Sequence, residues 1–383
     1  MTKLLRYDIK PLLILLFVYG CGGGGGNDDN PSQTATELQV IATPGDDGIF
    51  DPAPTWDGDT TLWMSHSSVN LSSDDPLLFQ VHTRIATSQD GGASWVDTGT
   101  DPNNASLLPD FQITVGVDTF WATWRFEVSR LFYDPYDSDA NRRWKILWHR
   151  VVAIGNPTPA ALFQNSWIGY SSAASPDGAW HDERKLFTGS LYNSADMDPI
   201  IGSPEFPLDT TYNSELGNCT LFTEPGVLAR SEGIYISLHC TGENKIVLLR
   251  CNRAFSNCEY VGDLLTAADA VPFSLSDQPI DFFSASELVD TATATYLIVT
   301  GVVETDDRYN GCLVFKVSDL ASATLERSGG EPVLVTLVNG NSGSFNGACG
   351  YDPHDTADGI IYSEFTPTSS PRFHLFSSHV TLP

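Results

Sequence analysis

From residue 36 onward, hydrophobic and polar positions alternate over short stretches, and helical periodicity is almost absent. Apolar, β-branched and aromatic residues gather in short segments, and a polar turn precedes each of them. The clearest such segments are 61–65, 144–149, 234–239, 296–300 and 359–363. This pattern predicts an all-β chain built from short strands and tight turns.

Each of these segments follows an apolar strand that has a carboxylate near its start. The stretch 219–240 shows the unit most clearly: Glu224-Pro-Gly leads into an apolar strand, a polar turn and the aromatic strand 234–239. The same unit occurs five times, with acids at Asp51, Glu127, Glu224, Glu287 and Asp352. Repeats of this kind imply radial closure, so we predict a five-bladed β-propeller over residues 37–383.

The N-terminus has the composition of an export signal. Three basic residues precede a short apolar run at 12–18, and Val-Tyr-Gly-Cys21 then resembles a bacterial lipobox. We therefore expect a lipoprotein signal peptide at 1–20, lipidation of Cys21 and a flexible, glycine-rich tether at 21–36. These features predict a protein of the bacterial cell envelope, held to a membrane by the lipid on Cys21.

The charge balance limits the choice of partners. The chain has 20 basic and 48 acidic side chains, giving a formal net charge of −28. Such a charge opposes binding to nucleic acid, or to anionic lipid through the protein surface. We therefore expect no nucleic-acid partner.

Six cysteines remain beyond Cys21, and an even number in an exported chain suggests disulfides. Six cysteines allow 15 pairings, so the sequence leaves the connectivity open. One attractive set joins Cys219 with Cys240, Cys251 with Cys258, and Cys312 with Cys349. No Cys/His spacing resembles a metal site, and we expect neither a metal nor a cofactor.

Two short motifs indicate propeller turns. Residues 88–95 match the Asp-box pattern S-x-D-x-G-x-[ST]-W, and 175–180 are a shortened relative. In such a turn the Asp and Ser side chains satisfy backbone amides while the Trp packs beneath. Both motifs are interpreted as structural.

At these residues the chain resembles the five-bladed propeller glycoside hydrolases of families 32 and 43. Asp51-Pro52 resembles their nucleophile or base position, Glu224-Pro225 resembles the general-acid position, and 175–180 are similar to an outer-strand motif of family 43. The resemblance covers about residues 40–383 in layout. It implies cleavage of glycosidic bonds in an oligo- or polysaccharide by paired carboxylates.

The resemblance also implies a third carboxylate that keeps the general acid protonated by like-charge repulsion. Glu127 is the first choice, with Asp134 and Asp198 as alternatives. Glu127 lacks the preceding Arg and the following Pro that family 32 has at this point, whereas Asp198-Pro199 has the dipeptide but no hairpin of its own.

Two neighbours of Glu127 are candidate substrate-binding residues. Trp124 could stack on a sugar face, and Arg125 could bind a hydroxyl or carboxylate of the sugar. The alternatives are core packing for Trp124 and a structural ion pair for Arg125.

Two other functions compete with the hydrolase. One is a non-catalytic propeller lipoprotein that binds carbohydrate or protein. The other is a sialidase, whose chemistry needs a Tyr nucleophile, a supporting Glu and three arginines at strand starts. Arginines are few here and do not lie at the five acids, so the sialidase ranks last.

Overall fold

The computed structural model describes residues 35–383, apart from 42–44, 59–60, 72–77, 105–107, 116–117, 155–159, 190–203, 211, 276, 304–307, 341–343 and 355–356. This described part is almost entirely strand. Its helical segments are three-residue 3-10 turns, none long and apolar enough to cross a membrane: η2 (Ala140–Arg142), η4 (Ser214–Leu216), η5 (Ala267–Asp269) and η7 (Leu320–Ser322).

The long strands form five successive antiparallel groups, which we call the first to fifth meanders. The first is β3 (Gly48–Trp56), β4 (Leu62–Leu71), β5 (Phe79–Ser88) and β6 (Trp95–Asp97). The second is β7 (Phe111–Val115), β8 (Asp118–Tyr133), β9 (Trp144–Ile154), β10 (Ala160–Ala173) and β11 (Trp180–Thr188). The third is β12 (Leu221–Arg230), β13 (Gly233–Thr241), β14 (Lys245–Cys251) and β15 (Cys258–Leu265).

The fourth meander is β18 (Phe282–Asp290), β19 (Thr295–Val303), β20 (Arg308–Asp319), β21 (Thr324–Leu325) and β24 (Leu334–Asn339). The fifth is β25 (Phe345–Gly350), β26 (Ile361–Phe365) and β27 (Phe373–Ser377), completed by β1 (Thr36–Leu38). The remaining short strands are β2 (Val40–Ile41), β16 (Ser274–Leu275), β17 (Gln278–Pro279), β22 (Arg327–Ser328) and β23 (Glu331–Pro332).

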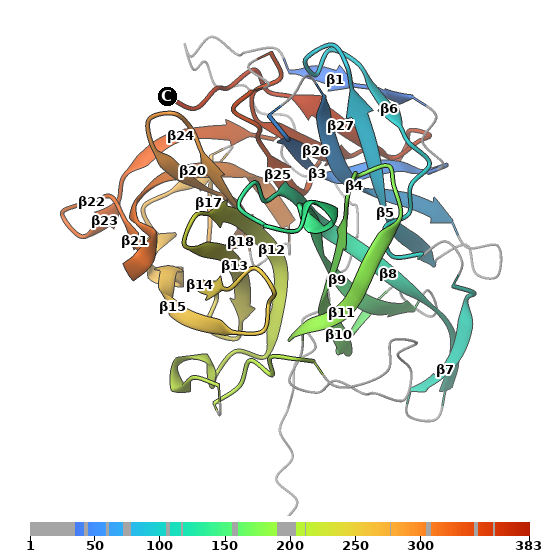
Figure 1. Ribbon diagram of the computed structural model, residues 1–383, viewed down its shortest axis with the longest axis horizontal. Coiled ribbons are helices and arrows are strands. Elements are labelled where there is room, and N and C mark those ends of the chain that lie inside the picture. Colours follow the sequence, from blue (N-terminus) through green and yellow to red (C-terminus); the bar gives the residue numbers. More distant parts are fainter. Residues whose placement is uncertain are drawn as a thin grey trace, which may run out of the picture.

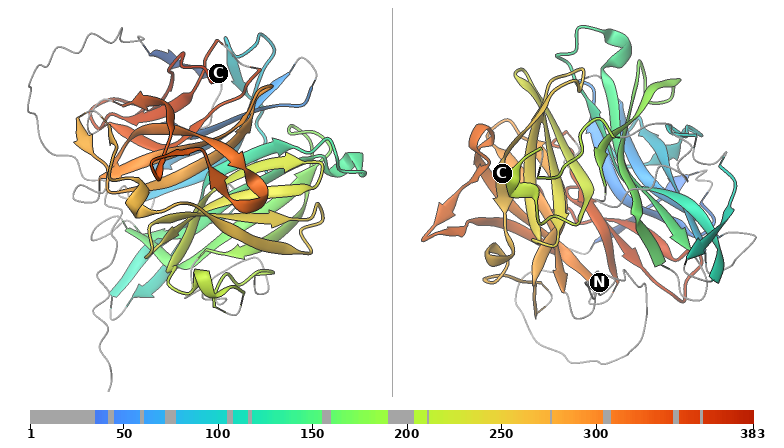
Figure 2. Two further views of the ribbon diagram at one scale, coloured as in Figure 1. Left: turned by 90° about the vertical axis from the view of Figure 1, so that its left-hand side faces the viewer. Right: turned by 90° about the horizontal axis from the view of Figure 1, so that it is seen from below.

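The meanders follow one another around a centre, in the colour order of Figure 1, and Figure 2 shows the same sheets from two other sides. Their first strands contact one another in a closed cycle, from β3 to β8, β12, β18, β25 and back to β3. A radial arrangement of antiparallel sheets is a β-propeller, in which short edges replace one long open edge. The predicted all-β propeller class is therefore confirmed.

The two ends of the propeller join at β3 and β27, which pair in parallel through Gly48 and Phe373. A Cβ on Gly48 would lie 2.0 Å from the Phe373 carbonyl oxygen, and its φ of +104° is one that side chains rarely adopt. Beside this contact, the Arg372 guanidinium grips both carboxylate oxygens of Asp47 at 2.6 to 3.0 Å. Glycine and a two-point ion pair thus close the ring.

The hydrophobic core lies between neighbouring meanders rather than in one central mass. Each cluster joins side chains from two adjacent sheets. Fully or nearly fully buried examples are Trp63 with Ile146, Leu147 with Ile236, Leu248 with Leu297, Ile298 with Tyr362, and Met64 with Ile361. Each sheet is therefore covered by its neighbours, and its inner strands are buried over most of their length, polar residues included.

Every first strand has a β-bulge near its middle. The register with the second strand shifts between Phe50 and Ala53, Glu127 and Arg130, Thr223 and Gly226, Phe283 and Ser286, and Asn346 and Gly350. The first bulged residue has a positive φ in four of the five: Asp51 (53°), Val128 (50°), Glu224 (58°) and Gly347 (68°). Bulges re-aim side chains, and here they repeat at equivalent places around the ring.

This repeat corrects three sequence predictions. Glu127 lies just before the bulge of β8, Glu287 lies beyond the bulge of β18, and Asp352 lies beyond the end of β25. The residues equivalent to Asp51 and Glu224 are Val128, Ser284 and Gly347. In the last two meanders, the sequence pattern of apolar and acidic residues led to the wrong positions. A bulge of two or three residues shifts the strand register, and the pattern does not reveal that shift.

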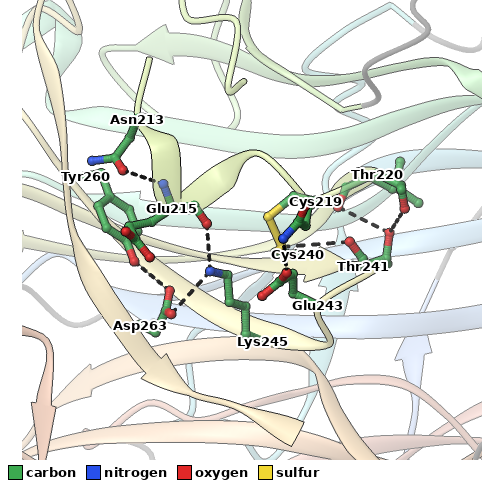
Figure 3. The surroundings of a disulfide bond; sticks show 12 residues. Asn213, Glu215, Cys219, Thr220, Cys240, Thr241, Glu243, Lys245, Tyr260 and Asp263 are labelled. Atoms are coloured by element: carbon green, nitrogen blue, oxygen red, sulfur yellow. Dashed lines mark hydrogen bonds and ion pairs between the residues drawn. A yellow bond between two sulfur atoms is a disulfide. The ribbon is translucent and has the colours of Figure 1, made fainter. Parts of the chain in front are cut away.

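The structure has the three disulfides of the predicted set: Cys219–Cys240, Cys251–Cys258 and Cys312–Cys349. The first joins the segment before β12 to β13 (Figure 3). Beside it, Lys245 Nζ donates to the Glu215 carbonyl at 2.8 Å and lies 3.2 Å from an Asp263 carboxylate oxygen. Together these contacts fasten the η4 segment to the sheet of the third meander.

Candidate active site

The bulges of β3, β8 and β12 bring Asp51, Glu127 and Glu224 into one electrostatic neighbourhood. The negative charge of Glu127 raises the pKa of both Asp51 and Glu224. One carboxylate shifts the pKa of another in this way only when the two groups lie close together in an interior that screens charge weakly. The three predicted acids come from three meanders whose first strands contact one another, and they lie close enough for their charges to interact.

Asp51 is wholly buried, and its carboxylate accepts hydrogen bonds from three directions. The Ala348 N–H donates to Oδ1 at 2.8 Å, while the Val128 N–H and the Ser67 hydroxyl donate to Oδ2 at 3.1 and 3.0 Å. Burial is the main cause that raises the pKa of Asp51 to about 7. The hydrogen bonds from Ala348 and Ser67 and the charge of Arg130 oppose that rise.

The close fit around Asp51 depends on Gly347. A Cβ at this position would lie 2.2 Å from Oδ1 of Asp51, well inside the contact limit. The residue also has a φ of +68°. Glycine therefore lets the backbone of β25 approach the carboxylate closely enough for the Ala348 N–H to reach it.

Glu224 is also buried, and hydrogen-bond donors hold both its carboxylate oxygens. The Tyr309 hydroxyl donates to Oε1 at 2.6 Å, and the Ser284 hydroxyl donates to Oε2. Burial raises the pKa of Glu224 above its ordinary value, the hydrogen bonds from Ser284 and Tyr309 lower it, and the charge of Glu127 raises it further. The net effect favours the protonated acid.

His239 lies beside Ser284 and Glu224. Its Nδ1 lies 3.2 Å from the Ser284 hydroxyl and 3.8 Å from Oε2 of Glu224, and its ring stacks on Phe282. Burial lowers the pKa of His239 to about 4, so the imidazole is neutral near pH 7. Since Ser284 donates to Glu224, the consistent tautomer has its proton on Nδ1 and donates to Ser284.

Glu127 is the most accessible of the three acids. Its side chain is 14% exposed, against 8% for Glu224 and none for Asp51. It forms an ion pair with Arg125, two residues earlier on the same face of β8. His149 lies opposite Glu127 on β9, and its Nε2 is 2.7 Å from the Ser166 hydroxyl. Arg125 thus lies beside Glu127 and is ion-paired with it, which is the structural alternative to sugar binding.

Trp124 lies on the opposite face of β8 and packs in the core. It is 5% exposed, and the Arg150 guanidinium covers its indole at 4.2 Å from the ring centroid. Phe111 packs against it, with ring centroids 6.0 Å apart. The structure therefore gives Trp124 a packing role, because strand alternation turns it away from Arg125 and Glu127.

Of the two alternatives to Glu127, the structure describes Asp134 but not Asp198. Asp134 is buried in a separate network, in which its carboxylate contacts Lys145 at 3.4 Å and Arg253 at 3.3 Å. Asp198 lies outside the described residues, as do the predicted signal peptide and Cys21. Of the two candidates that can be placed, Glu127 and Asp134, it is Glu127 that acts on Asp51 and Glu224.

Sequence reasoning missed the residues that hold the acids. Ser67 comes from the second strand of the first meander, Ser284 from the first strand of the fourth, and Tyr309 from its third. None has a local sequence signature, since each is defined by its register against another strand. Across the described residues, no group of three or more His, Cys, Asp or Glu side chains is arranged to hold a metal ion.

No protein-family model matches the sequence, and no curated protein sequence does. Solved structures do share its fold. One is an exo-β-1,3-galactanase from Phanerochaete chrysosporium with galactose, at 11% identity and a TM-score of 0.50 over 89% of this chain. Another is a xylan β-1,4-xylosidase from Bacillus halodurans, at 12% identity and a TM-score of 0.50 over 88% of this chain.

This chain spans 62% of the galactanase chain and 53% of the xylosidase chain. A variant of the galactanase with one glutamate replaced by alanine has also been solved with β-1,3-galactotriose. At such low identity the likeness extends to the fold alone. The structure is thus a propeller of the kind found in glycoside hydrolases that act on polysaccharides, with three carboxylates at its centre.

Proposed function

We propose that this chain is a glycoside hydrolase that cleaves glycosidic bonds of an oligo- or polysaccharide. Glu224 is the general acid that protonates the leaving oxygen, and Asp51 is the nucleophile or the base that activates water. Glu127 keeps Glu224 protonated by like-charge repulsion, and Arg125 beside it contacts a polar group of the sugar.

The observation that carries this proposal is that the charge of Glu127 raises the pKa of two other carboxyl groups, Asp51 and Glu224. Glycoside cleavage needs an acid that is protonated at working pH and a second carboxylate that is ionised. Burial and the charge of Glu127 raise the pKa of both Glu224 and Asp51, the latter to about 7. The two groups differ in their donors: Asp51 accepts from two backbone N–H groups and Ser67, whereas Glu224 accepts from the hydroxyls of Ser284 and Tyr309. On that difference we assign the ionised role to Asp51.

One observation favours a second candidate, a propeller that binds carbohydrate without cleaving it. Asp51 has no exposed surface, and three donors already use its carboxylate. Its part in hydrolysis requires the centre of the ring to open far enough to admit water or a sugar. In the binding protein, Asp51 would only tie the meanders together.

Activity on a panel of aryl glycosides and polysaccharides separates the two candidates. The hydrolase requires turnover in the parent, with Glu224→Gln and Asp51→Asn each removing most of it while near-UV circular dichroism stays unchanged. Glu326→Gln is the matched control, because Glu326 forms an exposed ion pair with Lys316. Sugar binding that persists in both variants, without turnover in the parent, would establish the binding protein instead.

We further propose that the protein is lipid-anchored at the bacterial cell envelope through Cys21. The sequence of residues 1–21 supports this, as does the set of three disulfides, which suits an oxidising compartment. Mass spectrometry of the N-terminal peptide of the mature protein tests it. A diacylglyceryl-modified Cys21 is expected, and Cys21→Ala should move the protein from the membrane to the soluble fraction.

A further inference from the structure

We propose that Tyr309 is a positioning residue of this site, holding Oε1 of Glu224 and stabilising the negative charge left there when the acid has given its proton to the leaving group. The inference rests on the proposed function, since it assigns Glu224 the general-acid role. It adds a residue that no sequence motif marks and that comes from a different meander.

The contact is direct and short. The Tyr309 hydroxyl donates to Oε1 of Glu224 at 2.6 Å, from β20 of the fourth meander to β12 of the third. The Ser284 hydroxyl holds the other oxygen, Oε2. With a donor on each oxygen, the carboxylate plane is fixed, as a proton donor needs for a defined direction of transfer.

The backbone around Tyr309 is fixed as well. The side chain of Asn310 donates to the buried Leu275 carbonyl at 2.7 Å. At Gly311, φ is +132° and a Cβ would lie 2.3 Å from the Val338 carbonyl oxygen, and the next residue, Cys312, is bonded to Cys349. The hydroxyl is therefore held in place from its own strand and not by Glu224 alone.

The surroundings keep Tyr309 a hydrogen-bond donor. Burial and then the negative charge of Glu224 raise the pKa of its hydroxyl well above the ordinary value, and the charge of Asp51 raises it further. A phenolate is thus strongly disfavoured between two carboxylates. This argues against the tyrosine-nucleophile chemistry of a sialidase, although Tyr309 and Glu224 are paired as that chemistry would require.

A donor on Oε1 stabilises the ionised form of Glu224 and opposes the effect of burial on its pKa. Removing the hydroxyl should therefore raise the pKa of Glu224, by about one pH unit for a hydrogen bond to a charged group. Tyr309→Phe removes that single atom and keeps the ring. Tyr296→Phe is the matched control, because Tyr296 is a buried tyrosine of the same meander whose hydroxyl donates to the Pro383 carbonyl at 2.9 Å.

The experiment titrates the Glu224 carboxyl by NMR in protein labelled with ¹³C-glutamate, the signal being assigned by its loss in Glu224→Gln. We expect the midpoint to rise by about one unit in Tyr309→Phe and to stay in place in Tyr296→Phe. In Tyr309→Phe, the basic limb of the pH–rate profile should move to higher pH by the same amount, with kcat reduced and KM little changed, whereas Tyr296→Phe should leave the profile in place.

A midpoint that is unchanged or lowered in Tyr309→Phe overturns the proposal. Complete loss of turnover with an unmoved midpoint does so as well, and would indicate a nucleophile. Absence of turnover in the parent, with a raised midpoint in Tyr309→Phe, would refute the hydrolase and leave the role of Tyr309 toward Glu224 supported.

Discussion

The backbone N–H of Ala348 donates to Oδ1 of Asp51 at 2.8 Å, across 297 residues of sequence. The same carboxylate accepts from the Val128 N–H, so a single side chain joins β3, β8 and β25 at the centre of the ring. Because the first and fifth meanders meet only where the chain closes, this contact forms only once the propeller is complete.

Gly347→Ala should displace the Asp51 carboxylate by adding a single Cβ atom beside it. The new Cβ would lie 2.2 Å from Oδ1 at a φ of +68°, so either the carboxylate or β25 must move. We expect turnover to be lost and unfolding free energy to fall by more than the roughly 1–2 kcal/mol that a positive φ alone costs. Thermal and urea unfolding, together with activity, measure both effects.

Gly329→Ala is the control for backbone strain. Gly329 has a nearly equal φ of +65°, but a Cβ there would meet nothing within 4 Å. It should lose only the strain energy and keep full activity. Equal losses in the two variants would show that contact with Asp51 does not matter.

Glu127→Gln should lower the pKa of both Glu224 and Asp51, because the charge of Glu127 raises both. A general acid with a lower pKa loses its proton at lower pH, so the basic limb of the pH–rate profile should move to lower pH. This is opposite to the direction expected for Tyr309→Phe. A limb that stays in place would exclude Glu127 as the modulating acid.

Glu287→Gln should make the protein more stable in alkaline solution. Burial is the main cause that raises the pKa of Glu287 from 4.5 to about 8, the charge of Arg130 opposes the rise, and Asp352 adds to it. The folded state binds this proton more tightly than the unfolded state does. Stability from this group is therefore complete below about pH 4.5 and is lost as pH rises through 8.

We expect Glu287→Gln to match the parent near pH 4 and to exceed its unfolding free energy by a few kcal/mol near pH 9. Urea unfolding at the two pH values measures the difference. The exposed Glu326→Gln should leave the pH dependence of the parent unchanged. A parent and a Glu287→Gln variant with the same pH dependence would contradict the assignment.

The three disulfides should contribute unequally. They close loops with sequence separations of 37 (Cys312–Cys349), 21 (Cys219–Cys240) and 7 (Cys251–Cys258). If constraint of the unfolded chain dominates, replacing each pair by alanine should cost about 4, 3 and 2 kcal/mol in that order. Urea unfolding of the three double variants tests the order, and a reversed order would mean that folded-state contacts dominate.

The pattern of the chain predicted much of this architecture because its cues are local. Alternating strands, polar turns and a proline after an acid mark β3 and β12, and Asp51 and Glu224 were found there. Trp124 and Arg125 show the limit: adjacent residues on one strand point to opposite sides, so one lies in the core and the other beside Glu127. In the fourth and fifth meanders the same cues chose Glu287, which lies beyond the bulge of β18, and Asp352, which lies beyond the end of β25.

By itself, the sequence determined the all-β class, the positions of the second strands and three carboxylates worth testing, since strand periodicity and turn chemistry act over a few residues. Tertiary structure alone decided which groups surround those carboxylates. Ser67, Ser284, Tyr309 and the N–H of Ala348 reach Asp51 or Glu224 through ring closure and repeated bulges. Protonation depends on burial and on charges brought from other meanders, and neither exists until the ring has closed.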